Sequence, residues 1–139
     1  MKKMTAKILF VASVVSYIIS LCVPAFYDAR SPQAWFGLGA LLNGIFGLFG
    51  GYYCWLANPL IVMVWIVAWI KRPVLVIGGA SLSCALCLSF LCYHAVEDEV
   101  GTTPIVGLGP GYWLWLLSPL LMIFYGLFSL KKKEVIHDA

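Results

Sequence analysis

The sequence predicts an all-α integral membrane protein in which four transmembrane helices form two tandem helical hairpins with the same orientation. Three observations support this fold class. First, 63% of the 139 residues are hydrophobic, 11% are charged, and the mean hydropathy is +0.96, whereas soluble domains average about 45–50% apolar and about 25% charged residues. Second, four apolar stretches are long enough to cross a bilayer. Third, the chain repeats itself at a spacing of 60 residues.

The repeat aligns residues 51–60 with residues 111–120 without a gap. The same register extends in both directions and gives ten identities over the 28 positions of residues 45–72. A weaker similarity, at a spacing of 70, pairs Asp28 with Asp98. Each copy is therefore expected to consist of a helix, an outer loop and a second helix.

These boundaries describe one transmembrane domain, residues 1–139. The first repeat covers residues 8–72, the second covers residues 74–132, and a cytoplasmic tail follows at residues 133–139.

The expected spans supply the roughly 20 apolar residues that a hydrocarbon core about 30 Å thick requires, and none of them contains a charged side chain. They are residues 8–26, 52–70, 74–93 and 112–130. The alternative for the first span is a cleaved signal peptide, because Lys2 and Lys3 precede an apolar run that ends near Ala25. The length of the run and the repeat favour a retained helix.

The basic residues predict the orientation of the spans. Eight of the nine Lys and Arg residues flank the spans on one side, and Arg30 lies on the other. By the positive-inside rule, both termini are expected to be cytoplasmic. The net charge of +3 is thus explained by topology, and we expect no nucleic-acid partner.

The first outer loop contains an extra apolar segment, residues 34–51, which we expect to form a glycine-rich interfacial helix. A fifth span is disfavoured because it would place Lys71 and Arg72 opposite the basic N-terminus. Small residues recur along the segment in steps of three and four, which on a helix forms a surface for close packing. A re-entrant lid over an outward-facing cavity is the alternative.

Aromatic residues are duplicated where a helix of each copy enters the membrane from the outside. They include Tyr52 and Trp55 in the first copy, and Tyr112 and Trp115 in the second. Tyr and Trp favour this depth because the ring is buried while its polar tip stays hydrated. Interfacial anchoring explains them, and a ligand-binding platform is the alternative.

A proline follows a polar residue in each copy, in the pairs Asn58-Pro59 and Ser118-Pro119. Proline removes a helical hydrogen bond, so each helix should bend and leave a carbonyl free for a nearby polar side chain. This pattern is typical of a packed kink. Alternatively, two related kinks frame a shallow polar pocket. Asn58 and Ser118, with the four aromatic residues above, are therefore the candidate binding residues.

Cys84 and Cys87 form a CxxC pair. In size and helix number the chain faintly resembles the vitamin K epoxide reductases and the bacterial disulfide-forming membrane oxidoreductases, which place such a pair at a helix end. Here Cys84 is expected near mid-bilayer, and the outer loops hold no second cysteine pair. Thiol-disulfide oxidoreductase activity is therefore an alternative to simple packing of buried cysteines.

No other catalytic or cofactor-binding pattern stands out. His94 with Glu97, Asp98 and Glu99 is typical of a solvated acidic loop, so we expect no metal site. We also expect no cofactor and no catalytic residue, because motifs for haem, phosphate or nucleophilic catalysis are missing from the sequence. The spans lack the ionisable groups that transporters and pumps generally need.

Residues 55–60 (WLANPL) and 107–115 (GLGPGYWLW) resemble a group of small four-span proteins of bacterial inner membranes. The resemblance implies a fold and a location, and implies no activity.

The function favoured by the sequence is non-enzymatic. We expect an interaction protein, either an immunity-type protein or an accessory subunit, that binds a membrane or periplasmic partner, or itself, through its outer face. The alternative from another class is binding or transport of a small lipid-like or neutral solute in a pocket under the outer loops.

Overall fold

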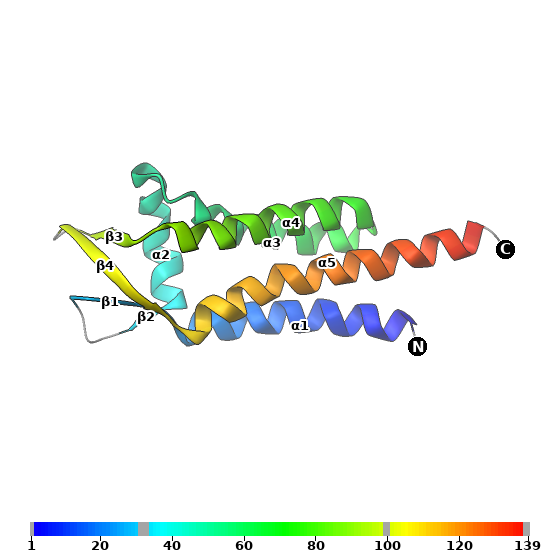
Figure 1. Cartoon of the computed structure of the whole chain (residues 1–139). Coiled ribbons are helices and arrows are strands. Elements are labelled where there is room, and N and C mark those ends of the chain that lie inside the picture. The colour runs from blue at the N-terminus through cyan, green and yellow to red at the C-terminus, as the bar shows by residue number, and fades with distance from the viewer. Residues whose placement is uncertain (1, 31–33, 99–100, 138–139) are drawn as a thin grey trace.

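The computed structural model describes residues 2–30, 34–98 and 101–137. Within these ranges the long helices run along one axis and end at a small β-sheet (Figure 1). They are α1 (Lys2–Cys22), α3 (Ala57–Trp69), α4 (Pro73–Ser89) and α5 (Pro110–His137). A shorter helix, α2 (Gly37–Gly47), runs across the bundle at the sheet end.

Three segments of the described chain are long and apolar enough to cross a membrane: Met4–Cys22, Pro73–Cys92 and Pro110–Lys131. The remaining candidate, Tyr53–Trp69, is shorter and combines the 3-10 turn η2 (Tyr53–Leu56) with α3. Three of the four expected spans are thus supported by length and composition. The fourth stays a prediction.

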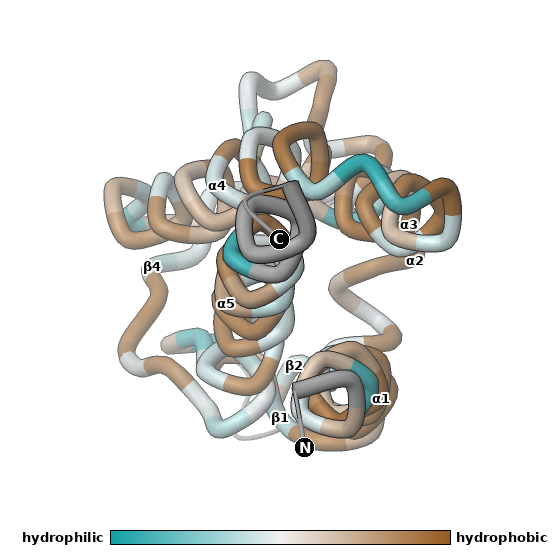
Figure 2. The backbone as a smooth tube through the Cα atoms, turned by 90° about the vertical axis from the view of Figure 1, so that its right-hand side faces the viewer, coloured by the Kyte–Doolittle hydropathy of each residue, from teal (hydrophilic) through white to brown (hydrophobic). Residues whose placement is uncertain are grey.

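The helices of the two copies interlock. Helix α5 packs against both α1 and α4, and α4 packs against α3, as the view along the bundle shows (Figure 2). One reason is that α1 buries small hydroxyl residues, Ser13, Ser16 and Ser20, at helical spacing. Small residues let helices approach closely. The structure therefore does not confirm two separate hairpins.

The all-α prediction is wrong for the outer segments, which form a four-stranded antiparallel sheet in the order β2-β1-β4-β3. The strands are β1 (Pro24–Asp28), β2 (Trp35–Phe36), β3 (Ala95–Asp98) and β4 (Gly101–Leu108). Pairing into strands gives the backbone N–H and C=O groups of these segments hydrogen-bond partners, which they need because they lie near an apolar core. The β-branched residues Thr102, Thr103, Ile105 and Val106 favour it.

The sheet also shows which parts of the repeat are structurally equivalent. The similarity at a spacing of 70 matches Asp28 at the end of β1 with Asp98 at the end of β3. The outermost part of the 60-residue register does not match in structure, because Gly47 ends helix α2 whereas Gly107 lies in strand β4. The first copy therefore differs from the second by the insertion of α2.

The glycine-rich segment is largely helical, since α2 is followed by the 3-10 turn η1 (Leu48–Gly50). Its small-residue surface faces the bundle: a Cβ atom at Gly37 would overlap the Ser20 carbonyl, and one at Gly44 would overlap the ring of Trp55. The expected close packing is present. Glycine at these positions brings α2 against α1 and η2, and this closes one side of a cavity.

Candidate functional site

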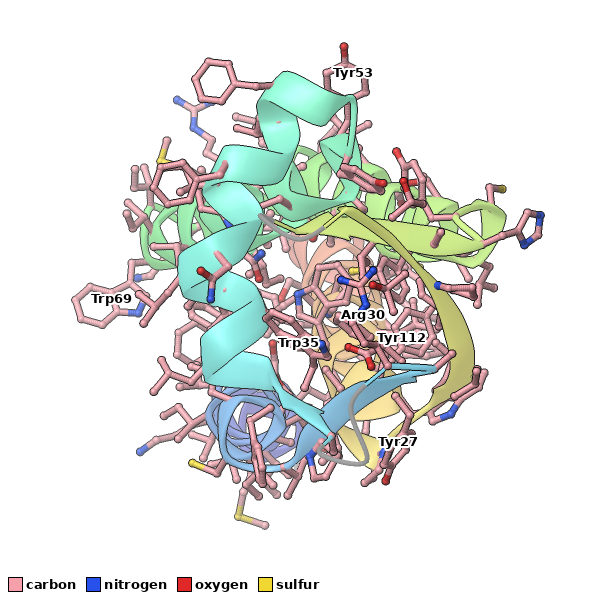
Figure 3. The ribbon with its side chains drawn as sticks, turned by 90° about the vertical axis from the view of Figure 1, so that its left-hand side faces the viewer. Tyr27, Arg30, Trp35, Tyr53, Trp69 and Tyr112 are labelled. Atoms are coloured by element: carbon pink, nitrogen blue, oxygen red, sulfur yellow. The ribbon has the colours of Figure 1, made fainter. Side chains whose placement is uncertain are left out.

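A cavity of about 760 Å³ lies beneath the sheet, between α2 and the ends of the long helices. Its walls come from both copies: Ser20 from α1, Phe26 from β1, Gly44 from α2, and Trp115 from α5. This volume falls in the range of pockets that bind small molecules, about 300–1,000 Å³. Figure 3 looks onto this end and shows Trp35 and Tyr112 in the space between α2 and β4.

The cavity is lined mainly by apolar and aromatic side chains. The aromatic ones are Phe26, Trp35, Phe46, Tyr52, Trp55, Phe90, Tyr112 and Trp115. Among the described lining residues none is Asp, Glu, Lys, Arg or His. A charged ligand would lose its hydration here without gaining an ionic partner, and that transfer is costly. The cavity therefore suits a neutral molecule.

Five of the six predicted binding residues line this one cavity: Tyr52, Trp55, Asn58, Tyr112 and Trp115. The sixth, Ser118, is fully buried elsewhere in the bundle. The structure thus brings together residues that the sequence repeat had singled out in both copies. Their role in binding stays a prediction.

Asn58 lies at the floor of the cavity and is 9% exposed. Its Oδ1 accepts hydrogen bonds from Tyr17 Oη (3.1 Å) and Trp115 Nε1 (2.9 Å). Its Nδ2 donates to the carbonyl of Trp55 at 2.9 Å. That carbonyl lies four residues before Pro59, which has no N–H to offer it. The amide side chain of Asn58 takes the place of the missing backbone donor, as the sequence led us to expect.

Ser118 belongs to a second polar layer deeper in the bundle. Ser13 Oγ lies 2.9 Å from the Ser118 carbonyl and 3.0 Å from Ser118 Oγ. Trp65 Nε1 donates to the same Ser13 oxygen at 3.0 Å. This layer connects α1, α3 and α5 below the cavity and has no access to it.

The two proline sites differ in structure. Pro59 stands in the first turn of α3, directly after η2, where the loss of an N–H is well tolerated. Pro119 is buried inside the continuous helix α5. Only the first proline thus coincides with a break between helical segments, and a bend at each proline stays a prediction. The alternative of a pocket framed by both proline sites is not supported, because Ser118 does not line the cavity.

The chain matches no known protein family, no curated protein and no solved structure. The resemblance to four-span bacterial proteins therefore stays a prediction.

The roof of the cavity was not predicted from the sequence. Trp35 stacks on Phe26, with ring centroids 5.7 Å apart and an interplanar angle of 11°. Its Nε1 donates to Asp28 Oδ2 at 2.6 Å, and the backbone N–H of Arg30 donates to Asp28 Oδ1 at 3.0 Å. Asp28 is therefore a buried acceptor that orients Trp35. This arrangement results from the pairing of β1 with β2, and no local sequence pattern predicts that pairing.

The alternative redox residues, Cys84 and Cys87, lie on α4 and are buried with Ala57, Tyr112 and Leu116. Both are free thiols. The described residues include no group of three or more His, Cys, Asp or Glu side chains placed to hold a metal ion. Of the acidic loop weighed as a metal site, Glu99 lies outside the described residues. Redox activity stays an untested alternative.

Proposed function

We propose that this protein is a four-span bacterial inner-membrane protein that binds a small, neutral, largely apolar molecule in the cavity beneath its sheet. The observation that carries the proposal is the cavity of about 760 Å³, lined by aromatic residues of both copies and by no ionic side chain among those described. Pockets of this kind, mostly apolar with a few polar groups, are typical binding sites for small molecules.

The proposed topology places the sheet and α2 on the outer side of the membrane. Figure 2 views the opposite end, where the two chain ends and the hydrophilic connection between α3 and α4 lie on the same side. Basic residues at this end, including Lys71, Arg72 and Lys131, support a cytoplasmic location. The segment Tyr53–Trp69 would be the fourth span. Its length of about 27 Å comes close to the thickness of the hydrocarbon core.

Helix α2 supports access of the ligand from the bilayer. One face packs through glycines against the bundle, while Leu42 on its outer side and Phe49 in η1 are 63% and 92% exposed. In the proposed topology these side chains would meet lipid at the outer interface. A ligand dissolved in the membrane would then reach the cavity beside α2.

Quenching of tryptophan fluorescence tests the proposal, because Trp35, Trp55 and Trp115 line the cavity. The purified protein in lipid nanodiscs is titrated with a brominated alkane. We expect a saturable quenching component above the linear component that is due to the lipid phase. Ala40→Phe places a ring in the cavity and should remove the saturable component.

Gly39→Ala is the matched control for Ala40→Phe, because a Cβ atom at Gly39 on the same helix meets nothing within 4 Å. It should leave the saturable component unchanged. Identical quenching of the wild type and Ala40→Phe would contradict ligand binding in this cavity.

A second candidate is the interaction function favoured by the sequence, with a protein partner bound to the outer face. The observation in its favour is the set of apolar side chains that project outward near η1 and η2, where Phe49 is 92% and Tyr53 is 59% exposed. Photocrosslinking from position 49 in native membranes tests this candidate. A crosslink to one defined protein supports it, and crosslinks to lipid alone contradict it.

A further inference from the structure

The side-chain amide of Asn58 makes three of its four possible hydrogen bonds. An asparagine side chain offers two acceptor sites on Oδ1 and two N–H donors on Nδ2. Tyr17 and Trp115 occupy both acceptor sites, and the Trp55 carbonyl occupies one donor. Within the described part of the chain, the second N–H of Nδ2 has no partner. Asn58 is one of the residues that line the cavity, so this N–H is a candidate donor to a ligand bound there.

The neighbours of Asn58 fix which way round its amide lies. The indole Nε1 of Trp115 only donates, so the atom 2.9 Å from it must be the amide oxygen. The backbone carbonyl of Trp55 only accepts, so the atom 2.9 Å from it must be the nitrogen. These two contacts point to the same orientation. The free donor is therefore held in place by groups on α5 and η2.

This arrangement is confined to the first copy. The equivalent residue of the second copy, Ser118, does not line the cavity, and its hydroxyl and carbonyl both lie against Ser13 Oγ. Asn58 thus supplies a buried, oriented donor among side chains that are mostly apolar, whereas the other lining amide, Asn43, is exposed on α2 and donates to the Gly39 carbonyl. An N–H left without a partner in such surroundings is unfavourable.

We infer that the ligand carries a carbonyl-type oxygen, as in a ketone or an ester, and that this oxygen accepts a hydrogen bond from Asn58 Nδ2 while the apolar body lies among the aromatic walls. The inference rests on the proposed function. Charged acceptors are disfavoured by the absence of ionic groups among the described lining residues. An alcohol is a poorer match, because its own donor cannot use Asn58 Oδ1, which already accepts twice.

A matched pair of probes tests the inference: a long-chain methyl ketone and the alkane with the same number of carbon atoms. Each competes with the brominated alkane for the wild-type protein in nanodiscs, and affinities are corrected for partition into the lipid. We expect the ketone to bind about five- to tenfold more tightly than the alkane, the effect of one hydrogen bond. Asn58→Leu should bring this ratio to about one and keep alkane binding, which also shows that the cavity is intact.

If Asn58→Leu does not fold, Asn58→Ala serves in its place, because it removes Nδ2 and introduces neither a charge nor another donor. Tyr17→Phe is the control, since it removes a donor to Oδ1 and leaves Nδ2 in place, so the ketone preference should persist. Equal binding of both probes to the wild type would overturn the inference and leave the proposed function standing. A ketone preference that survives in the folded Asn58 variant would also overturn it. If neither probe competes, the proposed function itself fails.

Discussion

Tyr17 and Asn58 are 41 positions apart in the sequence, and the Tyr17 hydroxyl donates a 3.1 Å hydrogen bond to Asn58 Oδ1. Trp115 completes the arrangement from the second copy, with Nε1 2.9 Å from the same oxygen. Three helical elements, α1, α3 and α5, therefore converge on one amide. This amide forms the cavity floor, so the stability of the bundle and the properties of the proposed site depend on the same side chain.

Replacing Asn58 with Leu should destabilise the protein by about 1–3 kcal/mol, because the Tyr17 hydroxyl, the Trp115 indole and the Trp55 carbonyl each lose a hydrogen bond to the amide. Unfolding in graded denaturing detergent, followed by circular dichroism, measures the change. Ser81→Leu is a suitable control, since Ser81 is exposed on α4. A stability equal to that of the wild type would show that the network contributes nothing.

Trp55→Phe should loosen α2, because Trp55 Nε1 donates to the Leu41 carbonyl at 2.7 Å. Limited proteolysis within residues 34–51 should become faster. Trp115→Phe removes the donor to Asn58 and leaves the contact with Leu41 in place, so the same segment should stay protected. Equal cleavage of both variants would argue against a specific role of Trp55 in holding α2.

Gly44→Ala should displace α2, since the added Cβ atom would overlap the ring of Trp55. We expect a loss of about 1–3 kcal/mol of stability, typical of overpacking, and weaker quenching by the brominated alkane. Gly39→Ala, with open space around the new Cβ atom, should behave like the wild type. If both alanine variants are indistinguishable from the wild type, the close packing of α2 is not required.

Cysteine accessibility distinguishes packing from redox chemistry. Cys22 and Cys92 are exposed, whereas Cys54, Cys84 and Cys87 are buried. In single-cysteine variants, Cys22 and Cys92 should react with a small maleimide, and Cys87 should react only after denaturation. Rapid modification of Cys87 in the native protein, or a disulfide between Cys84 and Cys87 after isolation from membranes, would favour the oxidoreductase alternative.

Reporter fusions test the proposed topology. Fusions after residues 72 and 132 should both report a cytoplasmic location, because residue 72 lies in the connection between α3 and α4 and residue 132 lies near the C-terminal end of α5. These two segments lie at the end of the bundle that holds the chain termini (Figures 1 and 2). A reporter inserted at residue 106 in β4 should lie on the other side of the membrane. Opposite locations for residues 72 and 132 would exclude the four-span arrangement.

The long helices were predictable because an uncharged apolar run of about 20 residues has the length and composition of a membrane-spanning helix. The sheet was not, because its central pairing joins Asp28 with Ile105, which lie far apart in the sequence. Short strands interrupted by Pro104 and Gly107 also lack the alternating pattern that marks a strand. The packing of α1 against α5 was not predictable either, because side-chain size, rather than hydropathy, selects which helices become neighbours.

The candidate site was predictable in part. Tyr52, Trp55, Asn58, Tyr112 and Trp115 were found through the repeat, and they come together because both copies present the same helix ends to one space. Trp35 and Phe26 were missed because they line the cavity only through strand pairing. Ser118 was misplaced because repeat equivalence does not fix the depth or the rotation of a helix.

The hydrogen bonds between β1 and β4 join the two copies. The first copy contributes the hairpin of β1 and β2, and the second contributes the hairpin of β3 and β4, so each hairpin alone would leave a strand edge unpaired. A chain that consisted of one copy alone would thus need a second molecule to pair with the exposed edge of its hairpin. With both units in one chain, β1 and β4 cover each other's edge within the same molecule.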